Sequence, residues 1–319
     1  MNASMNASTK RAPCVAILGA GRMGADMAIA FARQGWRCEV TEPSPAMRKH
    51  AAAYWTKEFR RLRVSAARKR ITLHEGHETP DWKAADLVVE AVFEDLKLKH
   101  RLLRDIEPRV RTDAIIATNT SGLRVQDVLR LLKRPERGAG LHFSVPAHVM
   151  LVVEMTRAPK TSDATMKKLL GWMDAMGKVA VVLNRDVPGM LINRIQHAMY
   201  REIYHLIDSG VTTAVDIDRA VRFGFGFRYN IIGPVVSRDI HGLPIHLATA
   251  KNLLPTLHNG RKPSATLEKL VKQGHHGVTT GRGFYEWDPK TVGKRLTEFT
   301  RLLETGVARI KRRGQPTEF

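Results

Sequence analysis

The first half of the chain alternates short apolar runs with longer segments in which apolar residues recur every three or four positions. The short runs are typical of buried strands and the longer segments of amphipathic helices. We expect strands at Cys14–Leu18, Arg37–Thr41, Asp86–Ala91, Ala114–Thr118, Gly138–Phe143, Leu151–Met155 and Val179–Leu183. We expect helices between them at Met23–Arg33, Pro45–Leu62, Leu96–Arg109, Val125–Leu131 and Thr165–Met176. This alternation predicts a mostly parallel sheet covered by helices, the α/β class.

The pattern changes after Asp186-Val187-Pro188-Gly189, because no convincing strand follows. Helical spacing is found instead at Met190–Asp208, Thr213–Arg222, Leu243–Leu254, Ser264–Gln273 and Lys290–Arg312. A Pro-Gly pair before a helix fits a domain boundary. We therefore expect an α/β domain over residues 12–186 and an all-α domain over residues 187–319. The polar, repeated start of the chain predicts a flexible tail over residues 1–11.

A glycine-rich turn links the first expected strand to the first expected helix. In the sequence GAGRMG, Gly19 permits a tight turn, Gly21 lets the backbone approach a pyrophosphate, and Gly24 lets the helix lie close to the strand. The phosphates would then lie at the helix N-terminus, where free N–H groups favour negative charge. We interpret the turn as a dinucleotide site and count Arg22 and Met23 among its cofactor-binding candidates. A glycine turn without a ligand is the alternative.

Glu42 ends the second expected strand, at the distance from the glycine turn that a dinucleotide site requires. A carboxylate there can accept both ribose hydroxyls of NAD and would repel the 2′-phosphate of NADP. The sequence therefore favours NAD, although the nearby basic residue Arg48 could weaken that preference.

Two residues with acid–base chemistry lie at or near the ends of expected strands. His142 ends one strand, and Glu154 lies in the apolar run of another. Ligands bind at the carboxyl ends of strands in open parallel sheets, so both residues are expected where chemistry occurs. A histidine can take a hydroxyl proton near neutral pH, and a carboxylate can orient it and stabilise the imidazolium. Without the rest of the pattern, a histidine at position 142 would more often be a hydrogen-bonded core histidine than a catalytic one.

Polar residues follow another expected strand in ATNTSG and open the second domain in PGMLINR. Ser121 offers a small hydroxyl at the same sheet edge, and Asn193 offers an amide. Either could be a helix cap instead. Asn119 is counted as a cofactor-binding candidate.

Composition narrows the class of protein. The chain has 319 residues, 43% of them hydrophobic, which excludes a disordered chain. Its apolar runs are too short for a membrane span, and its two cysteines fit a reducing compartment, so we expect a cytoplasmic protein. No metal site is expected. The net charge of +21 would attract nucleic acid, an anionic membrane, a nucleotide or coenzyme A. The basic run after the second strand lacks interleaved aromatic residues, so nucleic acid is an unlikely partner.

Several segments together resemble the 3-hydroxyacyl-CoA dehydrogenase family over nearly the whole chain. They are GAGRMG, ADLVVEAVFEDLKLK, ATNTSGL, GLHFSVPAHVMLVVEM, DVPGMLINR, DIDRAVRFGFGF and GRGFYEW, in the family's order and spacing. The resemblance implies a Rossmann-type NAD domain followed by a helical domain that makes a homodimer. It implies that His142 is the general base, oriented by Glu154, and that Ser121 and Asn193 hold the substrate oxygen. Glu94 and Lys99 match residues that line the cofactor, with Lys97 as a weaker candidate for the latter role.

Two departures from the family pattern affect the substrate. Val145 replaces an asparagine, so a hydrogen bond of the site is lost or supplied elsewhere, for example by Ser144. The segment GFGFRYNIIGP is longer than in short-chain acyl-CoA enzymes and resembles relatives that act on free hydroxy acids. Arg228 in this segment could then bind a substrate carboxylate, since its planar guanidinium suits bidentate pairing; it could equally be a solvated surface arginine.

Three hypotheses follow from the sequence. The leading one is NAD-dependent oxidation of an (S)-3-hydroxyacyl-CoA to the 3-oxoacyl-CoA, with an acyl-CoA as the small-molecule partner. The second is the same chemistry on a free hydroxy acid of the gulonate, carnitine or pyridine-carboxylate type. The third is a non-catalytic NAD-binding protein, which Val145 and the basic charge would favour.

Overall fold

The computed structural model describes residues 11–78 and 80–312 of the chain. The chain folds as two compact units, one formed by the chain up to Asn193 together with the chain from Leu303, and one formed by Arg194–Leu302. The tail expected over residues 1–11 lies outside the described residues except for Arg11. The guanidinium of Arg11 donates to the carbonyl oxygen of Ala84 at 2.7 Å and to Asp86 at 2.9 Å.

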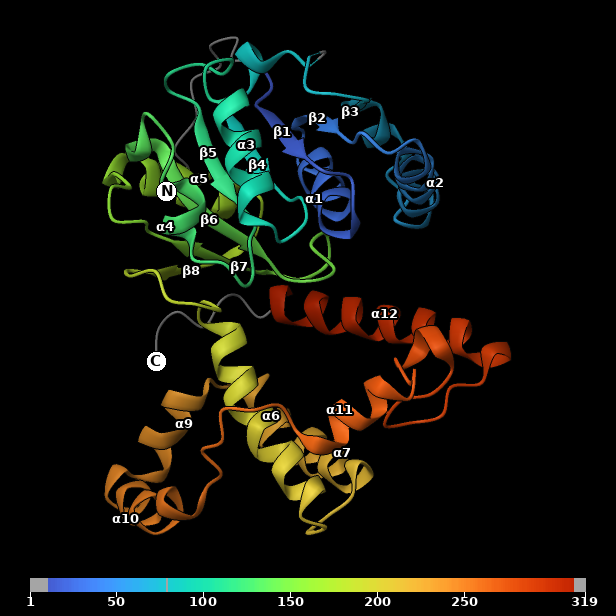
Figure 1. The fold of residues 1–319 in the computed structure, drawn as a ribbon, viewed down its shortest axis with the longest axis vertical. Helices are drawn as coiled ribbons and strands as arrows, with labels where there is room; N and C mark the ends of the chain where they lie inside the picture. Colours follow the sequence, from blue (N-terminus) through green and yellow to red (C-terminus); the bar gives the residue numbers. More distant parts are fainter. Residues whose placement is uncertain (1–10, 79, 313–319) are drawn as a thin grey trace. The chain divides into compact units, whose positions relative to one another are not determined.

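The first unit is built on one eight-stranded sheet with the order β3-β2-β1-β4-β5-β6-β7-β8 (Figure 1). Its strands are β1 (Cys14–Leu18), β2 (Arg37–Thr41), β3 (Ile71–His74), β4 (Leu87–Glu90), β5 (Ile115–Thr118), β6 (Gly138–Phe143), β7 (Val152–Thr156) and β8 (Val179–Leu183). Neighbouring strands are parallel except for the antiparallel pair β6 and β7. The strand order reverses between β1 and β4, which is where Rossmann-type sheets bind their ligands. The predicted α/β class with a mostly parallel sheet is confirmed.

Helices cover both faces of the sheet. They are α1 (Arg22–Arg33), α2 (Pro45–Arg61), α3 (Leu96–Ile106), α4 (Val125–Leu129) and α5 (Asp163–Ala175). Alternate residues of β1 point to opposite faces: Ile17 belongs to the core with α1, α2 and α5, and Leu18 to the core with α3 and α4. Trp55 and Phe31 are fully buried in the first of these cores. Packing on both faces explains why the strands read as continuous apolar runs.

One strand of the sheet was not predicted. β3 has four residues, ITLH, of which only Ile71 is buried, and it follows a basic 3₁₀ turn over Ser65–Arg70. As the edge strand it pairs only with β2, so its sequence carries little of the apolar signal of a central strand.

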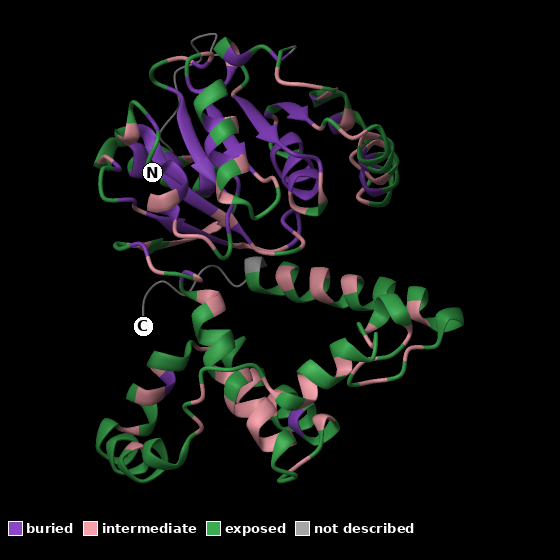
Figure 2. Ribbon diagram, in the orientation of Figure 1, coloured by how far each residue is buried: buried purple, intermediate pink, exposed green. Residues whose placement is uncertain are grey.

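The second unit is helical, as predicted. Its helices are α7 (Ala214–Phe223), α8 (Phe225–Tyr229), α9 (Pro234–His241), α10 (Leu243–Leu253) and α11 (Ala265–Lys272), while α6 (Ile192–Asp208) leads into it and α12 (Pro289–Arg312) leads out. Of residues 194–302, only Ile217 and Ser237 are buried, in contrast to the first unit (Figure 2). Within the described part of the chain, no helix is both long and apolar enough to cross a bilayer.

Candidate active site

The glycine-rich turn joins β1 to α1 with the geometry that its sequence predicted. Gly19 has a φ of +96°, a conformation that side chains disfavour, and its N–H donates to the Thr41 carbonyl at 2.8 Å. A Cβ on Gly24 would lie 1.9 Å from the Gly19 carbonyl oxygen, so only glycine lets α1 pack this close to the turn. The two glycines therefore fix where α1 begins.

The same turn has an open side that fits a dinucleotide. A Cβ on Gly21 would meet no atom within 4 Å, so the backbone at the start of α1 is accessible to a pyrophosphate. The Glu42 carboxylate lies beside the turn, accepting from the N–H groups of Ala20 and Ser44 at 3.0 Å each. This places an acceptor next to the glycines, where the ribose hydroxyls of NAD would bind.

Arg48 does not pair with the Glu42 carboxylate through any described contact. Its guanidinium donates to the backbone carbonyls of Glu42 and Pro43 at 2.9 Å each and to Glu75 at 2.8 Å. A guanidinium that already donates to three acceptors is poorly placed to bind the 2′-phosphate of NADP. The arrangement supports the preference for NAD.

His142 and Glu154 form a direct hydrogen bond. The Nδ1 atom of His142 lies 2.8 Å from Oε2 of Glu154, and the two side chains are 12% and 0% exposed. Because a carboxylate only accepts, Nδ1 carries the proton, and the tautomer leaves the lone pair on Nε2. The imidazole is thereby prepared to take a proton at Nε2.

The strand direction by which these two residues meet differs from the prediction. We expected Glu154 at the carboxyl end of a parallel strand, but β7 runs antiparallel to β6 and the register pairs His142 directly with Glu154. The connection between the strands, residues 144–151, is too short for the crossover that parallel neighbours require. The two side chains meet as a cross-strand pair on one face.

The second oxygen of Glu154 is also occupied. Oε1 accepts from the backbone N–H groups of Leu191 and Ile192 at 2.8 Å each. Burial would raise the pKa of Glu154, but the hydrogen bonds from His142, Ile192 and Leu191 outweigh it and lower the pKa. A buried, ionised Glu154 favours the proton on Nδ1 of His142.

Glu94 organises the loop that carries Ser121. Its Oε1 accepts from the Thr120 hydroxyl at 2.5 Å and from the N–H groups of Ser121 at 3.0 Å, Gly122 at 2.7 Å and Leu123 at 3.2 Å. Burial opposes ionisation, yet these donors and Lys99 lower the pKa of Glu94 to about 2. The carboxylate therefore holds the Ser121 backbone in place.

Lys99 is buried between two carboxylates. Its Nζ lies 2.7 Å from Glu90 and 3.1 Å from Glu94, and its side chain is 1% exposed. Glu90 also accepts from the Thr118 hydroxyl at 2.7 Å, which ties β4, β5 and α3 together. The structure places Lys99 beneath the loop that carries Ser121, while its contact with a cofactor stays a prediction.

Backbone links connect the remaining candidates to the His142–Glu154 pair. Asn119 accepts from the N–H of Phe143, the residue after His142, at 2.9 Å. Asn193 follows the two amides that bind Glu154, and its Nδ2 donates to the Ser121 carbonyl at 3.5 Å. The first unit thus brings Ser121 and Asn193 together and joins both to the pair. Arg228 lies on α8 in the second unit, and its part in the site stays a prediction.

Sequence reasoning missed Glu90 and the two amides on Glu154. Glu90 ends the run Leu87-Val88-Val89-Glu90, the same four-residue pattern as Leu151-Val152-Val153-Glu154, so the signal that identified Glu154 was available for it. The Leu191 and Ile192 amides have no such signal, because backbone donors are not encoded by side-chain type.

Comparisons with known proteins match both parts of the chain. Residues 14–187 match the family described as 3-hydroxyacyl-CoA dehydrogenase, NAD binding domain, and residues 189–287 match 3-hydroxyacyl-CoA dehydrogenase, C-terminal domain. A 5-formyl-3-hydroxy-2-methylpyridine 4-carboxylate 5-dehydrogenase of Mesorhizobium japonicum is 28% identical, over 91% of this chain and 98% of its own. A probable 3-hydroxybutyryl-CoA dehydrogenase of Bacillus subtilis is 29% identical, over 87% and 98%.

Solved structures show the same two kinds of relative. A 5-formyl-3-hydroxy-2-methylpyridine 4-carboxylic acid 5-dehydrogenase, described as an NAD⁺-dependent dismutase, has a TM-score of 0.84 at 27% identity and covers 95% of this chain and 99% of its own. The (S)-3-hydroxybutyryl-CoA dehydrogenase PaaH1 of Ralstonia eutropha has a TM-score of 0.70 at 30% identity, with coverages of 87% and 99%.

Proposed function

The chain belongs to the 3-hydroxyacyl-CoA dehydrogenase family, and from that premise we propose that it oxidises the hydroxyl of an (S)-3-hydroxyacyl-CoA to the 3-oxoacyl-CoA with His142 as general base. The cofactor of this family is NAD, and the chain is an NAD-dependent oxidoreductase. The observation that carries the assignment of the base is the 2.8 Å hydrogen bond between His142 and Glu154. Membership in the family also argues against the non-catalytic hypothesis.

The residues of the site suit this reaction step by step. Nε2 of His142 takes the hydroxyl proton of the substrate while the carbinol C–H bond breaks and a C=O bond forms. NAD supplies the hydride acceptor at nicotinamide C4. The charge of Glu154 stabilises the imidazolium as it forms, and the bond at Nδ1 keeps the ring aligned. Ser121 and Asn193 are proposed to hold the substrate oxygen, with Arg22, Met23, Asn119 and Lys99 on the cofactor side.

A free hydroxy acid is the second candidate substrate. The relative that acts on a pyridine carboxylate matches this chain over nearly its full length, with a TM-score of 0.84 against 0.70 for the hydroxybutyryl-CoA enzyme above. The phosphates of coenzyme A would bind most readily to basic side chains that have no other partner. Several of the arginines that follow β2, however, already have partners within the chain. Arg61 binds Glu58 and Glu304, Arg68 stacks over Trp55, and Arg70 donates to the Ala32 carbonyl.

A substrate panel with NAD separates the two candidates. We expect NADH formation from at least one member of a series of short to long 3-hydroxyacyl-CoAs or, in the second case, of free aromatic and aliphatic hydroxy acids. If a free acid is the substrate, Arg228→Met should raise its KM about tenfold or more, because a bidentate ion pair is lost. Arg219→Met, on α7 and paired with Asp216, serves as the matched surface control. Absence of turnover with both series would contradict the proposed function.

We propose that the second unit mediates a homodimer. Large apolar residues on α9 and α10 are exposed in the single chain, including Val235 at 75%, Ile240 at 62% and Ile245 at 69%. Large exposed apolar residues in number are typical of interaction surfaces, and a second copy of the chain is the commonest partner.

The mass of the particle in solution tests the dimer. Light scattering after size exclusion should give twice the chain mass of 35.8 kDa, and Ile245→Glu should shift the mass toward a single chain by burying a charge in the interface. Thr297→Glu, exposed on α12 rather than on α9 or α10, controls for added charge alone. A wild-type mass of one chain at micromolar concentration would contradict this proposal.

A further inference from the structure

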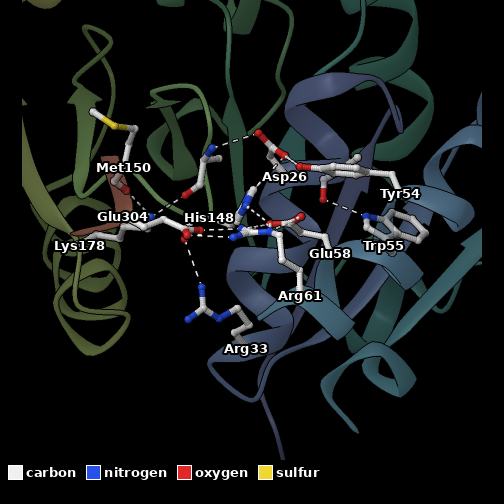
Figure 3. Close-up of polar contacts among 12 residues, drawn as sticks. Asp26, Arg33, Tyr54, Trp55, Glu58, Arg61, His148, Met150, Lys178 and Glu304 are labelled. Atoms are coloured by element: carbon white, nitrogen blue, oxygen red, sulfur yellow. Dashed lines mark hydrogen bonds and ion pairs between the residues drawn. The ribbon is translucent and has the colours of Figure 1, made fainter. Parts of the chain in front are cut away.

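A second buried histidine lies a few residues after His142, in the loop 144–151 that joins β6 to β7. Figure 3 shows His148 between side chains of α1 and α2. Its side chain is 3% exposed, with Nδ1 3.3 Å from Asp26 of α1 and Nε2 3.0 Å from Glu58 of α2. The site described above does not use this residue.

The same carboxylates hold the rest of the loop. Asp26 accepts from the Ala147 N–H at 3.2 Å and from the Tyr54 hydroxyl at 2.6 Å. From the other side, Nζ of Lys178 donates to the carbonyls of Ala147 and Met150 at 2.6 Å each. The loop is therefore held by buried charged groups that bind its backbone and the His148 side chain, whereas the side chain of Val145 cannot form a hydrogen bond and is 42% exposed.

The cluster extends to the C-terminal helix. Arg61 of α2 binds Glu58 and also lies 2.6 Å from Glu304, in the part of α12 that belongs to the first unit. Arg33 of α1 donates to the His148 carbonyl at 3.4 Å. Glu58 and Glu304 thus share the Arg61 guanidinium, whereas the cation that could pair with Asp26 in this cluster is His148 itself.

Two carboxylates around one imidazole determine its charge. Burial by itself would lower the pKa of His148, but the hydrogen bond to Glu58 and the ion-pair contact with Asp26 outweigh burial and raise it. Burial likewise opposes ionisation of Glu58, yet the bonds from His148 and Arg61 lower its pKa to about 2. An imidazolium paired on both sides avoids the cost of an isolated buried charge.

We propose that His148 is a positioning residue of the dehydrogenase, a buried imidazolium that holds the loop 144–151 against α1 and so sets the place of His142 relative to the cofactor turn. This role of His148 rests on the proposed function of His142. Asp26 lies two residues after Gly24 on the helix that opens at the glycine turn, and the loop begins two residues after His142. One cation therefore connects the strand that carries the base to the helix that carries the cofactor site. A displacement of about 1 Å between reacting groups can lower the rate of the reaction about 10²-fold.

The test compares His148→Gln with wild type using kcat, KM and NAD affinity. Gln keeps a donor for one carboxylate but removes the charge and the second contact. We expect kcat to fall about 10- to 100-fold. The Kd of NAD, measured by protein fluorescence, should change less than about threefold, because the variant leaves the glycine turn intact. His74→Gln breaks a comparable pair, with Glu39 at 2.5 Å between the edge strand β3 and its neighbour β2, and is expected to leave kcat unchanged.

The pH dependence of stability tests the charge of His148, whereas kcat separates a positioning role from a merely structural one. Because the pKa of His148 is raised by folding, its stabilisation is complete below the unfolded value of about 6.5 and is lost as pH rises through the folded value. The melting temperature of wild type should therefore exceed that of His148→Gln by more at pH 6 than at pH 9. Asp26, Tyr54, Glu58, Arg61, Lys178, Arg33 and Glu304 are the other ionisable groups of the cluster.

Failure of the positioning role can be distinguished from failure of the proposed dehydrogenase activity. If wild type oxidises neither substrate series, the proposed function fails, while the melting temperatures and an NMR titration of His148 still test its charge. An active wild type with kcat of His148→Gln within twofold of its own would overturn the positioning role, whatever the change in stability. If His148→Gln does not fold, Glu58→Gln replaces it, with a kcat loss expected and an unchanged kcat overturning the proposal.

Discussion

Replacing His142 by alanine is expected to lower kcat for alcohol oxidation by about 10²- to 10⁴-fold, the range that a positioned general base contributes. Nδ1 of His142 donates its proton to Glu154, so Nε2 keeps the lone pair that can accept the substrate proton. Removal of the imidazole leaves the hydroxyl proton without an acceptor while the glycine turn and Glu42 stay in place. The loss should therefore fall on kcat, and the Kd of NAD should stay within about threefold.

Single-turnover kinetics with saturating NAD separate this loss from slower product release. His142→Asn is the matched variant, because its amide keeps a polar group of similar reach but cannot take the proton. Both variants should lose activity to a similar extent. If alanine at position 142 retained near-wild-type kcat, another base would have to carry the reaction.

Glu154→Gln is expected to lower kcat by a comparable factor, about 10²- to 10⁴-fold, without adding or removing a heavy atom. The amide has only one acceptor oxygen, and the N–H groups of Leu191 and Ile192 require it. Its NH₂ group then faces Nδ1 of His142, which must become an acceptor. The proton moves to Nε2, the tautomer that cannot take a proton from the substrate.

The variant also removes the charge that stabilises the imidazolium. Since folding lowers the pKa of Glu154, its ionised form contributes stability above the unfolded pKa of about 4.3 that is lost as pH falls through the lower folded value. Glu39→Gln disrupts the His74 pair in the same sheet and is the control, with kcat unchanged. Equal kcat for Glu154→Gln and wild type across pH 6–9 would show that the pair is only structural.

Much of the sheet could be predicted because a strand that is buried on both faces appears in the sequence as a continuous apolar run. β1, β2, β6 and β8 have the predicted bounds, since each is a contiguous run of the expected type. β3 has no such apolar run, because three of its four residues are not buried. The return of the chain from Leu303 to the first unit could not be predicted either, because an ion pair such as Arg61–Glu304 joins residues far apart in sequence.

The candidate site shows a similar limit. His142 and Glu154 were identified by residue type and by their apolar surroundings, but their contact depends on the antiparallel register of β6 and β7, which loop length alone would have indicated. The environment of Lys99 and the role of His148 depend on carboxylates from other elements, at Glu90, Asp26 and Glu58. The type of a side chain identifies a residue as a candidate for a functional role, whereas the groups that contact it determine which role it can have.

Transfer of a deuterium label from the carbinol carbon to the cofactor tests whether this chain oxidises an alcohol by hydride transfer with His142 as base. The most active substrate of the panel is prepared with deuterium at the carbinol carbon and mixed with the enzyme and NAD, and the reduced cofactor is analysed by mass spectrometry. Wild type should yield reduced cofactor heavier by one mass unit, and His142→Ala should yield almost none in the same time. Unlabelled reduced cofactor from wild type, or full label transfer by His142→Ala, would contradict this mechanism.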